Sequence, residues 1–561
     1  MPDADSQTVN DYHAKIEAMA FPTLDPDEFD RLRPLASAVD YAAGDYILRH
    51  GEADTDLVVV EHGSVEIENP ADESDRHIAW HHEGSFIGDV DLLTRRPVIF
   101  DAVARGGKDG TPTRVLRVPG KDLRRLLNAV PKLSEKMMVA FQMRREGLES
   151  RKIKGLKVIG PGGCKHTNEV REFLQKNFVP YSWDDIGCEF TPNHDGPGTK
   201  YPTVECADGQ VLQRPSLQDV ASAAGVWRGC PEEKVDLAIV GGGPAGLAAA
   251  VYAASEGLST VVLDKLGPGG QAGGSSRIEN FIGFPSGLSG NDLATRGVLQ
   301  MLKFGAKMVA PVKVLQIEAA TKPGEYHKVK LDCGATIEAL CVLATTGVAW
   351  RRLGAEGAEK FERAGVYYAC TTVEADLHDD ADVAIVGGGN SAGQAVMFMA
   401  ERCKQRTVHL LVRSPLGKGM SDYLVNRIRS TSNVKVHEGV EVTAVRGTRR
   451  VETLEITCCE SREKTELKAQ AVYVFIGAEP HADWLPPEVA RDGGGYVLTG
   501  GDVVTAGKWP LADRPPCPLE TSVPGILAGG DVRAGSTKRV GFAVGDGSLA
   551  VTCVHRLRAG R

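Results

Sequence analysis

Two glycine-rich turns, each preceded by a short apolar run, constrain the fold of this chain more than any other feature. The first lies in LAIVGGGPAG (237–246) and the second in VAIVGGGNSAG (383–393). In a strand–turn–helix unit, such glycines let the backbone approach a pyrophosphate at the N-terminus of the helix. Two copies in one chain predict two dinucleotide-binding domains.

The first unit is complete through its second strand. The segment 235–265 reads as strand, turn, helix and strand, and it ends in TVVLDK. Gly241, Gly243 and Gly246 form G-x-G-x-x-G, and Asp264 closes the second strand. An acid at that place accepts hydrogen bonds from ribose hydroxyls. We therefore expect this turn to bind a dinucleotide.

The second unit differs from the first at the end of its second strand. Its turn consists of Gly387, Gly389, Asn390, Ser391 and Ala392. The strand ends in Arg413, where the first unit has an acid. An Arg at this place can pair with a 2′-phosphate, which favours NADPH, with NADH as the alternative. Ser414 and Lys418 are candidates for a further hydrogen bond and a further charge on that phosphate.

Three further segments resemble the thioredoxin reductase branch of the pyridine nucleotide-disulfide oxidoreductases. They are GPGGQAGGSSRIENFIGFPSGLSG (267–290), LATTGVAWRRL (343–353) and VPGILAGGDVRAGSTKRVGFAVGDGSLAV (523–551). The resemblance implies FAD on the first turn, NAD(P)H on the second, and a homodimer. By position it implies flavin contacts from Gly270, Gln271, Asn280, Asp531, Lys538, Arg539 and Val540. Asp531 would bind the ribityl chain, and residues 538–540 would close over the flavin ring.

The chain departs from that branch in GVYYACTTVEA (365–375), where the reductases carry Cys-x-x-Cys-Asp. The two cysteine positions hold Ala369 and Thr372, the acid position holds Val373, and Cys370 falls on the spacer. The acid normally protonates the leaving thiol, as a general acid must. Because all three groups are missing together, we predict that this site performs no dithiol chemistry and that Cys370 is a packing residue.

Residues 1–150 show short β-like segments between 39 and 118, followed by helical apolar spacing. YAAGDYILRHGEADTDLVVVEHGSVEIE (41–68) and FIGDVDLLTRRP (86–97) resemble the cyclic nucleotide-binding family. The family's ribose-binding Glu is replaced by Asp89, and its phosphate-binding Arg by Val98. Losing a charge-assisted hydrogen bond weakens binding by about ten- to a hundredfold. We expect a barrel used for docking or for another nucleotide-like ligand, with cyclic-nucleotide binding as the less favoured alternative.

Residues 152–232 resemble a thioredoxin or glutaredoxin unit without its dithiol. The pattern is strand, helix and strand over 156–187, then two strands and a helix over 201–226. Pro202 stands where that family keeps a cis-proline, and Cys164 is the one cysteine where it keeps Cys-x-x-Cys. A helix N-terminus lowers the pKa of a thiol, so Cys164 is a candidate reactive group. The favoured alternative is a structural adaptor.

The 561 residues therefore predict a multidomain α/β protein. We expect an N-terminal β-barrel with helices (1–150), a small thioredoxin-like α/β unit (152–232), and two Rossmann-like three-layer domains. The FAD domain spans 233–353 and 481–561, and the NAD(P) domain spans 354–480. The formal charge of −9 argues against nucleic-acid binding. The 12 cysteines show no metal-ligand spacing, and the acidic N-terminus is no signal peptide. We expect a cytoplasmic protein that neither spans a membrane nor holds a metal.

Two functions are compatible with these features. The first is an FAD enzyme that accepts hydride from NAD(P)H and passes electrons to an unknown acceptor, such as a quinone, oxygen, or a small redox protein reached through Cys164. The second is a flavin-containing sensor or adaptor that is regulated through the N-terminal barrel.

Overall fold

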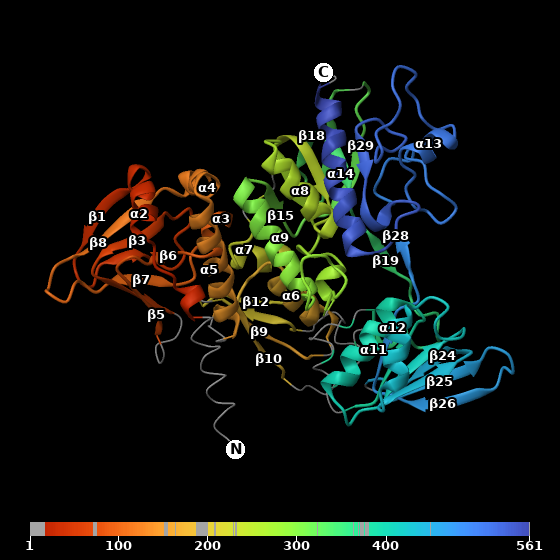
Figure 1. Ribbon diagram of the computed structural model, residues 1–561. Coiled ribbons are helices and arrows are strands. Elements are labelled where there is room, and N and C mark those ends of the chain that lie inside the picture. Colours follow the sequence, from red (N-terminus) through yellow and green to blue (C-terminus); the bar gives the residue numbers. More distant parts are fainter. Residues whose placement is uncertain are drawn as a thin grey trace.

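The computed structural model describes most of the chain. The described residues are 17–70, 76–150, 155–162, 164–186, 200–206, 209–227, 229, 233–275, 277–322, 324–362, 364–368, 370, 375, 378, 381–448 and 450–559. In Figure 1 the chain runs from a barrel (red and orange) through a small central unit to two larger α/β domains. The expected multidomain architecture is confirmed.

The N-terminal barrel consists of two four-stranded sheets. One has the order β1 (Ser37–Tyr41), β8 (Thr113–Val118), β3 (Leu57–His62), β6 (Phe86–Ile87); the other has the order β2 (Tyr46–Leu48), β7 (Asp101–Ala104), β4 (Ser64–Glu68), β5 (His77–His82). The helices are α2 (Pro26–Leu32), α3 (Val90–Thr94), α4 (Gly120–Ala129) and α5 (Pro131–Ser150). Alternate residues of β4, such as Val65 and Ile67, face an apolar interior, as period-2 patterning predicts.

A small α/β unit follows the barrel. Its sheet has the order β10 (Tyr181–Asp184), β9 (Leu156–Ile159), β11 (Thr203–Glu205), β12 (Val211–Gln213), with helices α6 (Lys165–Lys176) and α7 (Leu217–Ala223). β9 and β10 are parallel, and β11 is antiparallel to both β9 and β12. The Tyr201–Pro202 peptide is cis, as the resemblance implied.

The first dinucleotide fold is built on a seven-stranded sheet. Six strands follow the order β15 (Lys307–Val309), β14 (Thr260–Leu263), β13 (Lys234–Val240), β18 (Thr336–Ala344), β17 (His327–Leu331), β16 (Val314–Glu318), and β29 (Ile526–Ala528) pairs with β18. α8 (Pro244–Ser255), α9 (Gly290–Phe304) and α14 (Val540–Ala559) pack on the sheet in one apolar cluster. Because β29 comes from the C-terminal part of the chain, the sheet joins segments that the second fold separates.

The second dinucleotide fold is inserted between these segments in the sequence, and in Figure 1 (cyan) it lies below the first fold. Its parallel sheet has the order β20 (Val366–Tyr367), β27 (Ala471–Val474), β21 (Val383–Val386), β22 (Val408–Val412), β23 (Val434–Glu438), with helices α11 (Asn390–Arg402) and α12 (Asp422–Ser430). A three-stranded antiparallel sheet of β24 (Val440–Arg446), β25 (Thr453–Cys458) and β26 (Lys464–Lys468) accompanies it. β19 (Val348–Trp350) and β28 (Ala478–Pro480) pair antiparallel where the chain passes between the two folds.

The barrel is joined to the first dinucleotide fold by an apolar contact. α3 and α4 contact α9, and their side chains share one buried cluster. Leu126 and Leu127 of α4 lie in the same cluster as Val298 and Leu302 of α9. This continuous core fixes the barrel against the fold that carries the first turn.

Candidate cofactor sites

The first glycine turn has no room for side chains at two positions. Gly241 has φ +109°, and a Cβ there would lie 2.4 Å from the carbonyl oxygen of Thr345. A Cβ on Gly246 would lie 2.0 Å from the carbonyl oxygen of Gly241. Gly243 is the N-cap of α8, with Pro244 as the first helical residue. The turn thus presents backbone N–H groups at a helix N-terminus, which is a ready anion-binding site.

Asp264 is held firmly at the end of β14. Its Oδ2 accepts a hydrogen bond from the backbone N–H of Gly242 at 2.7 Å. Its Oδ1 accepts from Leu266 and Gly267, each at 2.9 Å. A carboxylate has about four acceptor sites, so one remains for a ribose hydroxyl. The predicted ribose acid therefore lies directly beside the predicted pyrophosphate turn.

The loop after Asp264 packs against the same turn. Gly270 has φ +53°, and a Cβ there would lie 2.9 Å from the Cα of Gly243. Gln271 donates from Nε2 to the carbonyl oxygen of Val348 in β19. The structure thus places Gly270 against the turn. Asn280 lies farther along the chain, in the exposed loop 279–285.

Asp531 lies in a short 3₁₀ turn that follows β29. Burial raises the pKa of its carboxyl above the ordinary value; the nearby Lys538 opposes this rise, and Asp546 adds to it. Asp546, on α14, accepts from the backbone N–H of Gly530 at 2.9 Å and from Arg533 Nε at 3.1 Å. Lys538 is exposed and donates to the hydroxyl of Tyr496 at 2.6 Å. Arg539 is exposed and Val540 begins α14.

Two residues that support the first site were not expected from the sequence. Thr345 Oγ1 donates to the carbonyl oxygens of Val240 and Gly241, at 3.1 and 2.9 Å, and so holds the turn. Asp546 holds the Gly530–Asp531 turn. Thr345 lies about one hundred residues from the turn that it holds, and Asp546 lies on a different element, α14, from the turn that it holds. Short motifs carry no signal for such contacts.

The second turn repeats the geometry of the first. A Cβ on Gly387, which has φ +144°, would lie 2.3 Å from the carbonyl oxygen of Phe475. Gly389 is the N-cap of α11, and Ala392 is fully buried. Asn390 Oδ1 accepts from the backbone N–H of Ser421 at 2.8 Å and from its hydroxyl at 3.0 Å. Asn390 therefore fastens the loop 413–421 to the turn, while Ser391 is exposed.

That loop carries the predicted phosphate-binding groups. Arg413 is exposed immediately after β22, and Ser414 is partly buried. Gly419 forms a β-bridge with Gly389, which brings the exposed Lys418 next to the turn. Two exposed cations therefore lie in the loop that follows the carboxyl end of β22.

The structure places the two candidate cysteines in buried positions. Cys370 is 8% exposed and belongs to an apolar cluster with Tyr367 and Ala375. Ala369, Thr372 and Val373 lie outside the described residues. Cys164 is the N-cap of α6, as expected, and is 3% exposed. Within the described ranges no cysteine forms a disulfide, and this includes the neighbours Cys458 and Cys459.

The barrel shows what replaces the cyclic-phosphate site. Val98 is 4% exposed and packs in the apolar interior with Phe100. Asp89 is 4% exposed and pairs with Arg145 Nη2 at 2.7 Å. A Cβ on Gly88 would lie 2.1 Å from Leu92 Cδ1, so that side chain fills the adjoining space. At the two positions where the family binds the cyclic phosphate and its ribose, this chain thus has an aliphatic residue buried in the core and an acid that already forms an ion pair.

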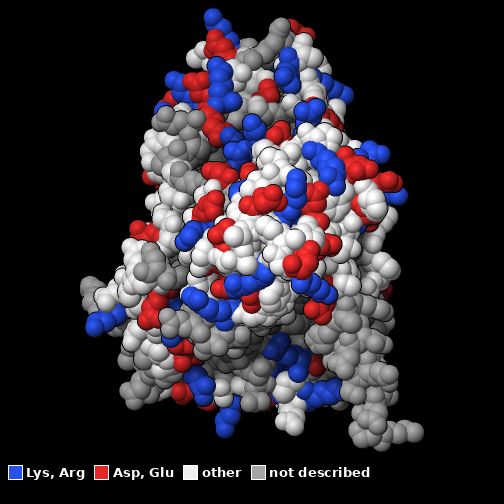
Figure 2. Space-filling model, turned by 90° about the vertical axis from the view of Figure 1, so that its left-hand side faces the viewer, with Lys and Arg blue, Asp and Glu red and all other residues white. Residues whose placement is uncertain are grey.

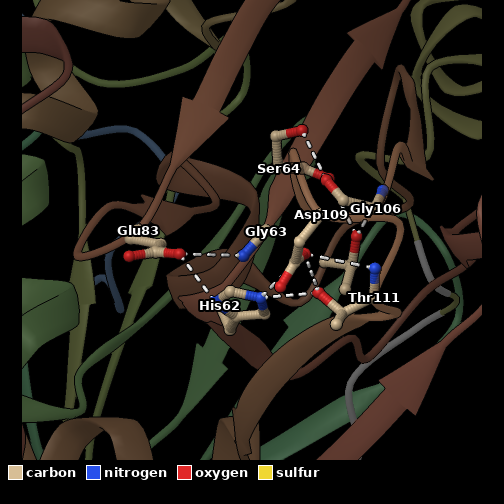
Figure 3. Close-up of polar contacts among 8 residues, drawn as sticks. His62, Gly63, Ser64, Glu83, Gly106, Asp109 and Thr111 are labelled. Carbon is tan, nitrogen blue, oxygen red and sulfur yellow. Dashed lines mark hydrogen bonds and ion pairs between the residues drawn. The ribbon is translucent and has the colours of Figure 1, made fainter.

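A polar cluster ties together three turns at one end of the barrel (Figure 3). His62 Nδ1 pairs with Glu83 Oε1 at 2.8 Å, and its Nε2 hydrogen-bonds Thr111 Oγ1 at 2.7 Å. The Thr111 hydroxyl also donates to Asp109 at 2.6 Å, and this hydrogen bond holds the pKa of Asp109 below its ordinary value. His62, Glu83 and Asp109 are 43, 59 and 63% exposed, which suits a solvated tie between loops rather than an active site.

The remaining features of the described residues concern surface charge, membrane-spanning helices and metal sites. Figure 2, which looks onto the side where the barrel lies, shows acidic and basic side chains interspersed over that face. In the described ranges, none of the helices has the length and apolar character needed to cross a bilayer. The same ranges contain no cluster of three or more His, Cys, Asp or Glu side chains able to hold a metal ion.

Curated relatives match the C-terminal part of the chain. An alkyl hydroperoxide reductase component from Staphylococcus aureus (strain MSSA476) is 30% identical over 342 residues, which is 60% of this chain and 62% of the relative. The chain thus spans less than two thirds of that relative. The "34.2 kDa protein in rubredoxin operon" of Clostridium pasteurianum is 29% identical over 331 residues, covering 59% of this chain and 99% of the relative.

Solved structures match the same region. Thioredoxin reductase of T. acidophilum is 28% identical, with a TM-score of 0.52, and the match covers 58% of this chain and 99% of that one. The Lactococcus lactis thioredoxin reductase in its FR conformation has the same TM-score at 22% identity, covers 58% of this chain and 100% of that one, and supports the fold alone.

Two family descriptions match the chain. Residues 38–129 match the cyclic nucleotide-binding domain. Residues 235–547 match the pyridine nucleotide-disulphide oxidoreductases, a match that includes both glycine turns and the Asp531 turn. More than half of the chain is covered by this second match, and the protein is therefore an oxidoreductase that belongs to the pyridine nucleotide-disulphide oxidoreductase family.

Proposed function

We propose that the protein takes a hydride from NADPH onto FAD and passes the electrons to an acceptor without a Cys-x-x-Cys pair of its own. The observation that supports this most directly is the combination of two open glycine turns with Arg413 and Lys418 after the second one. The three groups of the family's dithiol site are replaced together, and Cys370 is buried among apolar side chains.

The residues of the first site fit FAD. The N–H groups at the start of α8 would bind its pyrophosphate, Asp264 a ribose hydroxyl, and Asp531 the ribityl chain. The exposed Lys538 and Arg539 would lie over the flavin ring. When bound, the flavin supplies the hydride and electron chemistry, and the chain binds and orients it. Asp531 is partly buried, and its carboxyl oxygens can accept hydrogen bonds from sugar hydroxyls.

The second site fits NADPH. The N–H groups at the start of α11 would bind the pyrophosphate, while Arg413 and Lys418 would bind the 2′-phosphate. Ser414 would add a hydrogen bond. NADH is the alternative donor, and it would gain nothing from either cation.

We place the acceptor outside the chain. Relatives named for thioredoxin and alkyl hydroperoxide reduction point to a small redox protein. Cys164, the candidate relay for such a partner, is 3% exposed, which favours direct transfer from the flavin to a quinone, a small carrier or a partner's disulfide.

Anaerobic mixing of the flavin-loaded protein with NADPH or NADH tests the proposal. We expect NADPH to bleach the flavin absorbance faster than NADH at equal concentration. Turnover with a quinone should persist in Cys164→Ser and Cys370→Ser. Failure of both nucleotides to reduce the flavin would refute the proposed hydride transfer from NAD(P)H and favour a sensor.

A sensor or adaptor function is the second candidate, because the barrel shares a buried core with α9 of the flavin-binding fold.

A homodimer is also part of the proposal. Tyr252 on α8, and Phe542 and Leu549 on α14, are large apolar side chains that are 47, 58 and 41% exposed. Sedimentation of the full chain, with Phe542→Glu as the variant, measures this association.

A further inference from the structure

The thioredoxin-like unit touches the loop that follows the ribose acid Asp264. Asn177, directly after α6, is 2% exposed, and its Nδ2 donates to the carbonyl oxygen of Leu266 at 2.8 Å. The neighbouring Lys176 donates from Nζ to the carbonyl oxygen of Gly270 at 3.4 Å. Both ends of the loop 266–270 are therefore bonded to the end of α6.

A glycine lets this contact form. A Cβ on Gly267 would lie 2.7 Å from Asn177 Nδ2 and 3.0 Å from Lys176 Cβ. Real Cβ atoms do not approach other heavy atoms so closely, so any larger residue would push the end of α6 away from the loop. Gly267 also donates its backbone N–H to Asp264 Oδ1, so the contact and the ribose acid belong to one unit.

The other side of Asn177 is held by the barrel. Its carbonyl oxygen accepts from Arg96 Nη1 at 2.5 Å. The carbonyl oxygen of the next residue, Phe178, accepts from Arg145 Nη1 at 3.0 Å. Arg145 in turn pairs with Asp89, the acid at the barrel's ribose position. Asn177 thus lies between the barrel segment 89–97 and the loop 266–270.

We propose that Asn177 is a positioning residue for FAD: it fixes the loop 266–270, which in turn holds Asp264 and keeps Gly270 against Gly243. The thioredoxin-like unit, which has no dithiol, then lies between the barrel and the loop 266–270. Through these contacts the barrel affects how tightly FAD is held. This inference rests on the proposed binding of FAD at the first turn. It assigns a use to two domains that the hydride transfer itself does not need.

The test measures FAD dissociation from the full-length holoprotein by the rise in flavin fluorescence. Asn177→Leu keeps the number and branching of the side-chain heavy atoms. It removes both hydrogen bonds that Nδ2 donates, one to Leu266 across the contact and one to Phe173 within α6, each at 2.8 Å. Losing the buried hydrogen bond to Leu266, the one that reaches the loop, should speed FAD dissociation by about five- to thirtyfold. Arg96→Gln, a change in the barrel alone, should act in the same direction by a smaller factor.

Asn168→Leu is the matched control. Asn168 lies near the other end of α6 and donates from Nδ2 to Gly162 at 2.7 Å, within the thioredoxin-like unit. This control should leave FAD dissociation unchanged. Binding of NADP⁺ at the second turn, measured by calorimetry, should be unchanged in all three variants. A variant that is merely misfolded would lose both nucleotides.

The outcomes separate this inference from the proposal on which it rests. If the wild-type protein retains no flavin, the proposed function fails. If it retains flavin and Asn177→Leu, folded by circular dichroism, releases FAD at the wild-type rate, the positioning role is refuted. Equal effects of the Asn177 and Asn168 substitutions would also refute it. If Asn177→Leu does not fold, an unchanged rate in Arg96→Gln refutes the link to the barrel.

Discussion

Replacing Arg413 by Ala should change the choice of nicotinamide cofactor. Arg413 is exposed at the end of β22, so its guanidinium is hydrated before the nucleotide binds. Its hydrogen bond to a 2′-phosphate should therefore contribute a binding free energy of about 1.5 kcal/mol, the lower end of the range for charged hydrogen bonds. Lys418 would remain and would retain part of the attraction. We therefore expect the KM for NADPH to rise by about tenfold, and the KM for NADH, which has no 2′-phosphate, to stay constant.

Stopped-flow reduction of the flavin at varied NADPH and NADH concentrations measures this change without an electron acceptor. Lys404→Ala is the matched control, because Lys404 is also an exposed cation of the same domain but precedes the amino end of β22. It should leave both constants unaltered. Raising the ionic strength should weaken NADPH binding in the wild type more than in Arg413→Ala. An equal rise in both KM values, or none, would show that Arg413 does not contact the phosphate.

Four further predictions follow from individual contacts. Reductive titration of the holoprotein should consume two electrons per flavin; four would show a coupled disulfide and contradict the loss of dithiol chemistry. Gly246→Ala should abolish flavin retention because its Cβ would lie 2.0 Å from a backbone oxygen, whereas Gly493→Ala, which has open space around it and no left-handed φ, should retain flavin in the absorbance spectrum. Calorimetric titration with cyclic AMP and cyclic GMP should show no submicromolar binding, since Val98 supplies no charge; tight binding would overturn this view of the barrel. Burial lowers the pKa of His327 to about 4, so the imidazole stays neutral in the folded state. The stability that this neutral imidazole contributes is complete above the unfolded pKa of about 6.5 and is lost as the pH falls toward 4. Between pH 7.5 and 5 the wild type should lose about 2 kcal/mol more unfolding free energy in urea than His327→Gln, and parallel losses would contradict this.

The two dinucleotide folds could be predicted from the sequence because their requirements are local. A glycine with positive φ at the end of a strand, followed by a helix, is encoded within about ten residues. Gly241 and Gly387 both have this geometry. The absence of the Cys-x-x-Cys-Asp motif could also be predicted from the sequence, because it concerns which residues stand at three positions within a five-residue segment, 369–373. The cis-proline at Pro202 followed from the same kind of short pattern.

The supporting contacts could not be predicted, because each joins residues on different elements of the fold. Thr345 holds a turn about one hundred residues upstream, and Asp546 holds the Gly530 turn from another element. Sequence patterning placed Asp89 at a ligand position, but only the folded chain shows it paired with Arg145.

By itself, the sequence determined which cofactors this protein is built to hold and which redox pair it lacks, since glycine turns and missing cysteines are properties of short segments. Only the tertiary structure decided where the barrel and the small α/β unit contact the first dinucleotide fold. Their contact with the flavin loop depends on Asn177, Gly267 and Arg96, which meet only because three separately folded units pack together. Such packing depends on complementary surfaces, and no local pattern encodes it.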